Sequence, residues 1–164
     1  MRTVLHVGCG KEPLPSWMVG REVRLDIDEG VSPDIIAPMT DLGDIGPFDI
    51  VYTAHALEHL YPHEVNLCLA EIKRVLKKGG VAIVVVPDLD GIKPTGEVVY
   101  DSPAGQITGL DMYYGKSDLI EQNPYMAHKT GFTTDTLKST MERAGFEVRE
   151  CVSSNFNALV VAIA

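Results

Sequence analysis

The sequence is poor in cysteine and in basic side chains. Its 164 residues include three cysteines (Cys9, Cys68 and Cys151), and 23 acidic residues outnumber 14 basic ones to give a formal net charge of -9. An odd number of widely spaced cysteines argues against a disulfide framework and is typical of reduced thiols in the cytoplasm. Because a negative field repels phosphate backbones, we expect no nucleic acid among the partners.

Long hydrophobic runs are also missing. No apolar stretch reaches the roughly 18 residues that a membrane-spanning helix needs, and the short apolar run at the start leads into a glycine-rich turn without a signal-peptide cleavage site. We therefore expect no membrane association and a cytoplasmic location. The composition, 45% hydrophobic and 23% charged, is that of a globular protein. The length predicts one domain over residues 1–164.

Short β-branched runs alternate with segments of helical periodicity, which is the pattern of an α/β protein with a mainly parallel sheet. Continuous apolar runs suit strands that are covered on both faces. The last two predicted strands are joined by a short turn and must be antiparallel. The predicted strands are 3–7, 22–27, 34–37, 48–53, 80–86, 146–152 and 158–162, and the predicted helices are 62–78 and 134–145.

The segment 88–131 breaks this alternation. It contains six glycines, three prolines and four of the six tyrosines. A long irregular segment inside a compact domain is usually functional or disordered, and the tyrosines argue against disorder. We predict that 88–131 is a lid-like insertion over a binding site, with a purely structural excursion as the alternative.

Gly8, Cys9 and Gly10 follow the first predicted strand directly. Glycine permits a tight turn there and a close approach of the backbone to a nucleotide. Asp26, near the end of the second strand, places a carboxylate where it can accept hydrogen bonds from ribose hydroxyls. Pro13 stands where a nicotinamide-binding turn needs a third glycine, which argues against a dehydrogenase.

The order of several motifs is more specific than any single one. VLHVGCG is followed by RLDID, TDL, FDIVYTAHALEHL and EIKRVLKKGG with VAIVVVPDL. This order resembles the class I S-adenosylmethionine-dependent methyltransferases, and most closely their small bacterial type-11-like group. The resemblance covers 3–89 and 128–163. It implies a doubly wound, mainly parallel seven-stranded sheet with an antiparallel last strand (a Rossmann-like methyltransferase fold), S-adenosylmethionine as cofactor, and methyl transfer to a small-molecule acceptor.

The resemblance further implies individual roles for residues at the cofactor site. Gly8, Cys9 and Gly10 would line the methionine moiety, and Asp26 would hold the ribose hydroxyls, with Ile27 beside the adenine. Asp28 competes with Asp26 for the ribose.

The same resemblance gives roles to residues further along the chain. Asp41 would accept a hydrogen bond from the adenine amino group with Leu42 nearby, although Asp41 could instead cap a turn. Thr53, Ala54 and His55 would face the sulfonium end of the cofactor.

Two histidines are candidate general bases. Methyl transfer from a sulfonium needs alignment above all, and a base is needed only where the acceptor must lose a proton. Imidazole, with an ordinary pKa near ~6.5, suits that task. His55 lies beside the sulfonium by family position, and His128 joins it if the insertion covers the site.

Two departures from the family pattern concern the cofactor turn. His6 stands where the family usually has an acidic residue, and Glu12 where it has a third glycine, so the cofactor could bind more weakly or in a different arrangement. These departures favour one alternative, a non-catalytic module that binds S-adenosylmethionine or S-adenosylhomocysteine.

A zinc hydrolase is the third hypothesis. His55, Glu58 and His59 fit H-x-x-E-H, a zinc-peptidase pattern, and His63 adds an imidazole. Because Pro62 begins a new helix just after this motif, a continuous ligand-bearing helix is not predicted, and we assign no metal. Glu58 and His59 are expected to anchor the loop after the fourth strand.

The connection between residues 28 and 34 is too short for the usual crossover helix. One face of the sheet should therefore be thinly covered. Exposed apolar patches of this kind usually mark an interface, so we expect a homodimer.

Overall fold

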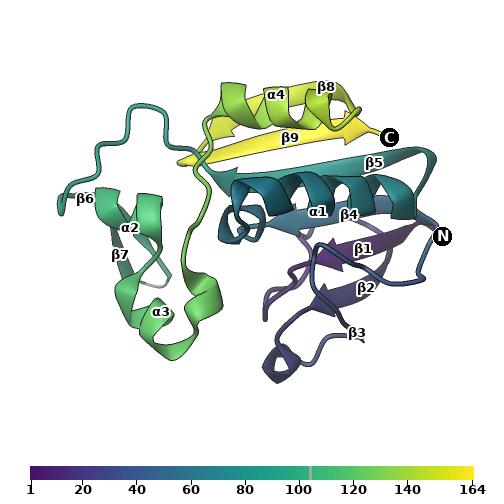
Figure 1. Ribbon diagram of the computed structural model, residues 1–164, viewed down its shortest axis with the longest axis horizontal. Helices are drawn as coiled ribbons and strands as arrows, with labels where there is room; N and C mark the ends of the chain where they lie inside the picture. Colours follow the sequence, from purple (N-terminus) through teal and green to yellow (C-terminus); the bar gives the residue numbers. More distant parts are fainter. Residues whose placement is uncertain (104) are drawn as a thin grey trace.

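The computed structural model, which describes residues 1–103 and 105–164, is built around one seven-stranded sheet (Figure 1). The strand order is β3-β2-β1-β4-β5-β9-β8, so the winding reverses direction between β1 and β4. All neighbours from β3 to β5 are parallel, whereas β9 is antiparallel to both β5 and β8. This confirms the predicted doubly wound, mainly parallel sheet with an antiparallel last strand. The strands are β1 (Thr3–Val7), β2 (Arg21–Asp26), β3 (Ile35–Ile36), β4 (Phe48–Ala54), β5 (Leu76–Pro87), β8 (Glu147–Ser154) and β9 (Asn157–Ile163).

The helices α1 (Pro62–Val75) and α4 (Thr134–Arg143) contribute to the main core on one face of the sheet. Pro62 occupies the first helical position of α1, where its missing N–H costs no hydrogen bond. The buried side chains of α1 recur at helical spacing and pack with strand residues such as Val51 and Val84. They are Val65, Cys68, Leu69, Ile72 and Val75.

The prediction that α1 runs to residue 78 is wrong, because Leu76 already begins β5. Leu76 pairs with Phe48 of β4, and the ammonium of Lys77 donates to Asp49 Oδ1 at 2.7 Å. Pairing with β4 therefore outweighs the helical propensity of Lys77 and Lys78.

The opposite face of the sheet has a smaller core. Met18, from the segment between β1 and β2, packs there with Val4, Ile50, Tyr52 and Ile83. Between β2 and β3 the chain forms only the single 3₁₀ turn η1 (Glu29–Val31). Other apolar side chains on this face, among them Val81, Val85 and Val161, are only partly buried. The expected thin cover of one face is confirmed.

The insertion carries more regular structure than its composition predicted. Figure 1 shows it beside the end of the sheet where β4 and β5 finish. The ring of Tyr100 stacks on Phe156, in the turn between β8 and β9, with ring centres 4.9 Å apart. Its elements are β6 (Val98–Ser102), β7 (Gly105–Thr108), α2 (Gly109–Tyr114), α3 (Ser117–Gln122) and the 3₁₀ turn η3 (Pro124–Met126).

The helices are all too short or too polar to cross a bilayer, in the part of the chain that the structure describes.

Candidate active site

A pocket of about 540 Å³ lies where β1, β2 and β4 end. In an open α/β sheet, ligands bind outside the carboxyl ends of the strands, at the point where the strand order reverses. The pocket also has the size of a small-molecule site. Seven of the predicted cofactor residues line it, namely Gly8, Cys9, Gly10, Asp26, Ile27, Ala54 and His55.

Three other predicted cofactor residues lie outside the lining. Leu42 is fully buried in the main core, and its N–H donates to Glu71 Oε2 at 2.9 Å. Asp41 accepts a hydrogen bond from the N–H of Gly43 at 3.2 Å, which is a turn cap. Thr53 is buried at 1% exposure. Their roles toward the adenine and the sulfonium stay predictions.

Several lining residues were missed by the sequence reasoning. Met39 and Thr40 line the pocket directly before Asp41, and Tyr52 lines it from β4. Tyr52 and Ala54 share one face of β4 because side chains alternate along a strand, whereas Thr53 points to the other face. From that alternation, Tyr52 could have been predicted to line the pocket together with Ala54. The insertion adds four more lining residues, which are Asn123, Tyr125, Met126 and Lys129.

The turn after β1 can be built only with glycine at its first position. Gly8 has φ of 65°, and a Cβ there would lie 2.5 Å from the Cβ of Ala56. Both the backbone conformation and the close approach exclude a side chain. The turn therefore keeps an open backbone surface toward the pocket.

Asp26 ties the glycine turn to the end of β2. Its Oδ2 accepts from the N–H of Gly10 at 2.8 Å, and its Oδ1 accepts from the N–H of Asp28 at 2.9 Å. Each carboxylate oxygen has a second lone pair. Asp26 can therefore hold the turn and still accept hydrogen bonds from a ligand hydroxyl.

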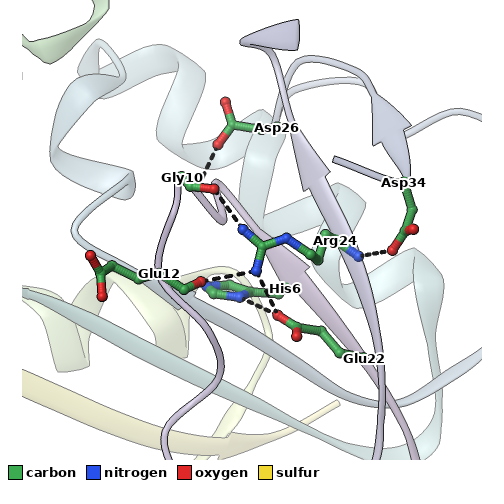
Figure 2. Close-up of polar contacts among 7 residues, drawn as sticks. All are labelled: His6, Gly10, Glu12, Glu22, Arg24, Asp26 and Asp34. Carbon is green, nitrogen blue, oxygen red and sulfur yellow. Dashed lines mark hydrogen bonds and ion pairs between the residues drawn. The ribbon is translucent and has the colours of Figure 1, made fainter. Parts of the chain in front are cut away.

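Arg24 holds the segment that leads away from the turn, as Figure 2 shows. Its guanidinium donates to the carbonyl oxygens of Gly10 at 2.6 Å and Glu12 at 3.0 Å. Arg24 pairs with His6 in the register of β1 and β2, so it stands next to that histidine. The side chain thus fixes by hydrogen bonds a segment that contains no helix.

Glu22 places a carboxylate beside His6. From the sequence, His6 was expected to stand where the family usually has an acidic residue. Glu22 Oε1 lies 2.8 Å from His6 Nδ1 and 3.4 Å from Arg24 (Figure 2). His6 is buried at 3% exposure, and this desolvation lowers the pKa of its imidazole although Glu22 opposes the shift. A neutral imidazole that donates to Glu22 therefore stands at the pocket wall.

His6 should make the protein less stable in acid. Because its pKa is lower in the folded state than the ordinary value near ~6.5, the unfolded chain binds more protons once the pH falls below that value. The free energy of unfolding therefore decreases as the pH drops through and below ~6.5. We expect His6→Asn, which retains a donor to Glu22, to lose part of this decrease in urea unfolding between pH 5 and 8. The exposed residue His63 provides the control, His63→Asn. An unchanged pH dependence in His6→Asn would contradict the assignment.

His55 has an unusual backbone at the rim of the pocket. Its φ is 51°, in the left-handed region that non-glycine residues rarely adopt and that is found most often at functional sites. The imidazole is about half exposed, with Nδ1 3.6 Å from Glu58 Oε1. The Glu58 carboxylate raises the pKa of His55, although partial burial acts against it.

Glu58 and His59 belong to the 3₁₀ turn η2 (Leu57–His59), so the H-x-x-E-H motif lies on no continuous helix, as predicted. The carbonyl oxygen of Glu58 accepts from the N–H groups of Lys129 at 2.8 Å and Thr130 at 3.1 Å. The loop after β4 is thereby anchored to the segment that leaves the insertion. His128 does not line the pocket, and its Nδ1 lies 2.9 Å from the Met112 carbonyl oxygen.

Comparison with known proteins agrees with this geometry. The methyltransferase domain family matches residues 2–151. A search of the curated proteins found no match. An S-adenosylmethionine-dependent methyltransferase from Mesorhizobium loti superposes with a TM-score of 0.71 at 17% identity, over 99% of this chain and 91% of that one. A Burkholderia thailandensis 1,6-didemethyltoxoflavin-N1-methyltransferase, with S-adenosylhomocysteine bound, superposes with a TM-score of 0.67 at 16% identity, over 99% of this chain and 70% of that one.

The family match covers most of the chain, and the solved structures share its fold. The pocket, the glycine turn and Asp26 stand where S-adenosylmethionine is expected from the sequence. The chain belongs to the methyltransferase domain family and has the fold of the S-adenosylmethionine-dependent methyltransferases.

Proposed function

We propose that this methyltransferase belongs to the type-11-like group and acts in the cytoplasm. We further propose that its acceptor is a small molecule, bound at the His55 end of the pocket. The observation that carries the proposal is that one pocket of about 540 Å³ contains both the glycine turn and His55. The Burkholderia relative binds a small molecule, 1,6-didemethyltoxoflavin, which supports an acceptor of that class. All three cysteines are free, which suits a reducing compartment.

The residues of the pocket fit the cofactor's parts. Gly8, Cys9 and Gly10 would hold the methionine moiety, Asp26 the ribose hydroxyls, and Ile27, at 43% exposure, would offer an apolar contact to the adenine. S-adenosylmethionine supplies a methyl group already activated on a sulfonium. The protein's task is then to align an acceptor with that carbon, which can account for about 7–11 kcal/mol of the barrier.

We infer that residues 88–131 act as a lid. Asn123, Tyr125, Met126 and Lys129 already line the pocket, and the aromatic contact between Tyr100 and Phe156 fastens the other part of the insertion to the sheet. Closing the site would exclude water from the reacting groups. The tyrosines of the insertion would contact the acceptor with their apolar rings and offer it a polar hydroxyl.

Of the two predicted bases, His55 is the better placed to take a proton from the acceptor, because it lines the pocket whereas His128 does not. We expect His55→Ala to lower turnover of an identified acceptor more than it lowers the affinity for S-adenosylhomocysteine. For the predicted second base, His128→Ala should likewise lower turnover more than affinity. Single-turnover methylation and calorimetry on each variant test this expectation. Wild-type rates in both would show that alignment alone accounts for the activity.

A module that binds the cofactor without methylating anything is the alternative, favoured by His6 and Glu12 at the turn. Calorimetry with S-adenosylhomocysteine should give one site per chain under either hypothesis. Transfer of a labelled methyl group from S-adenosylmethionine to candidate acceptors separates them. A chain that binds S-adenosylhomocysteine but labels no compound of a broad small-molecule panel would favour the binding module, and a chain that does not bind it would refute both.

We further infer that the thinly covered face of the sheet forms a homodimer. The half-buried side chains of Val81, Val85 and Val161 lie on it, and Trp17 is 61% exposed in the segment that crosses that side. Multi-angle light scattering at roughly tens of micromolar should give twice the 17.9 kDa of one chain. Val161→Glu should shift the mass toward the monomer, and a wild-type mass of 17.9 kDa throughout would contradict the dimer.

A further inference from the structure

Glu58, His59 and His128 form a compact cluster beside the cofactor pocket. Each side chain places one nitrogen or oxygen atom within 4.8 Å of the corresponding atoms of the other two. The first two residues come from η2, after β4, and His128 follows η3. The rings of His59 and His128 meet edge to face, with centres 5.1 Å apart. Two distant parts of the chain therefore bring three potential ligands together.

Hydrogen bonds to the backbone fix which ring nitrogen of each imidazole carries a hydrogen. His59 Nδ1 lies 3.2 Å from the carbonyl oxygen of Ala127, and His128 Nδ1 lies 2.9 Å from that of Met112. A carbonyl oxygen can only accept, so each Nδ1 must carry the hydrogen. In a neutral ring the lone pair is then on Nε2. Metal-binding histidines are typically oriented in this way, by donating their other N–H to a carbonyl.

No group in the described part of the chain donates a hydrogen bond to the carboxylate of Glu58. It is 2% exposed, and neither oxygen has a hydrogen-bond partner among the residues that the structure describes. The nearest cationic candidate is His55, at 3.6 Å. A buried carboxylate is costly unless it is paired or coordinates a metal. The cluster thus offers two imidazoles and a carboxylate as ligands, and the ion-pair partner found for Glu58 in the described part of the chain is the half-exposed His55.

We propose that Glu58, His59 and His128 bind one divalent cation of the zinc type. Imidazole nitrogens with one carboxylate favour zinc and similar transition metals over magnesium or calcium, which prefer oxygen ligands. Tetrahedral zinc ligands stand about 3.4 Å apart, so an ion would draw the three atoms slightly together. Because His59 lines the pocket, the ion lies at the pocket wall.

This site differs from the zinc site that the H-x-x-E-H pattern suggested. The pattern pairs His55 with His59, whereas in the structure the second imidazole is His128 and His55 is half exposed. The sequence prediction assigned no metal, because no continuous ligand-bearing helix was expected there. His128 is 69 positions away along the chain from His59, and only the fold brings the two together. Cation binding goes beyond methyl transfer and does not depend on it.

Zinc titration of the chelator-treated, full-length protein tests the proposal. Calorimetry should show one zinc ion per chain. Glu58→Gln and His128→Gln should each weaken zinc binding by at least about tenfold. Loss of a group that only hydrogen-bonds a metal ligand already costs that much, and loss of the ligand itself must cost no less. His63→Gln, an exposed imidazole on α1, is the matched control and should bind like the wild type. Circular dichroism checks that each variant is folded.

A second measurement uses only the wild type, in case a variant does not fold. Cobalt(II) should replace zinc and give two paramagnetically shifted, exchangeable proton signals from the Nδ1–H groups of His59 and His128. A folded wild type that binds no zinc would overturn the proposal. A bound proton, and not a metal ion, would then balance the negative charge of the cluster. Equal zinc affinity in wild type, Glu58→Gln and His128→Gln would overturn it too, as would a cobalt form without the two signals. S-adenosylhomocysteine binding, measured separately and without zinc, reports on the cofactor pocket and so tests the proposed function independently.

Discussion

Leu69→Ala is expected to lower the free energy of unfolding by about 2–5 kcal/mol, the usual cost of removing a buried leucine side chain and leaving a cavity. Leu69 is fully buried in the main core, between α1 and the sheet. The two longest helices pack on that one face, so this core contains most of the large buried side chains. Few other contacts can compensate for a cavity there.

Leu67→Ala is the matched control, because Leu67 lies on the same helix and is 54% exposed. Both substitutions change the helix propensity equally. We expect Leu67→Ala to change the free energy of unfolding by no more than about 0.5 kcal/mol. Urea unfolding of both variants at one protein concentration measures the difference, since association would otherwise contribute. Equal losses in the two variants would mean that the stability of α1 comes from propensity and not from packing.

Asp26→Ala should weaken S-adenosylhomocysteine binding by about 1–3 kcal/mol, roughly 5- to 150-fold, as expected when charge-assisted hydrogen bonds are lost. Two effects act in the same direction. The ribose hydroxyls lose their acceptor, and the N–H of Gly10 loses the Oδ2 that fixes the glycine turn. Calorimetry on the folded variant gives the affinity.

Asp28→Ala separates the two acidic candidates. Asp28 also lines the pocket, but its Oδ1 accepts from the N–H of Gly30 at 2.8 Å and caps η1. We expect the smaller loss for Asp28→Ala. If Asp26→Ala bound normally while Asp28→Ala bound weakly, the ribose contact would belong to Asp28.

Local pattern was sufficient to predict most of the sheet. Apolar runs placed β1 within its observed bounds, Thr3–Val7, and β4 to within one residue. The start of β5 was missed because residues 76–80 are strand only through pairing with β4 and the contact of Lys77 with Asp49. Such long-range contacts leave no periodic signal in the sequence.

The same limit applies to the site. The glycine turn and Asp26 were predictable because each directly follows, or ends, a strand whose carboxyl end must face the pocket. Arg24 was not, because its contacts with Gly10 and Glu12 depend on the register of two parallel strands. The meeting of Glu58 with His128 requires the path of the whole insertion.

The place of β9 in the sheet has a consequence for the nascent chain. β9 lies between β5 and β8 and pairs with both, although β8 is synthesised before it. Until β9 emerges, the apolar strand β5 has an unpaired edge of N–H and C=O groups, and β8 has no strand to join. Such edges promote intermolecular pairing. Dependence on ribosome-associated chaperones should therefore be greatest while the insertion, α4 and β8 are being translated.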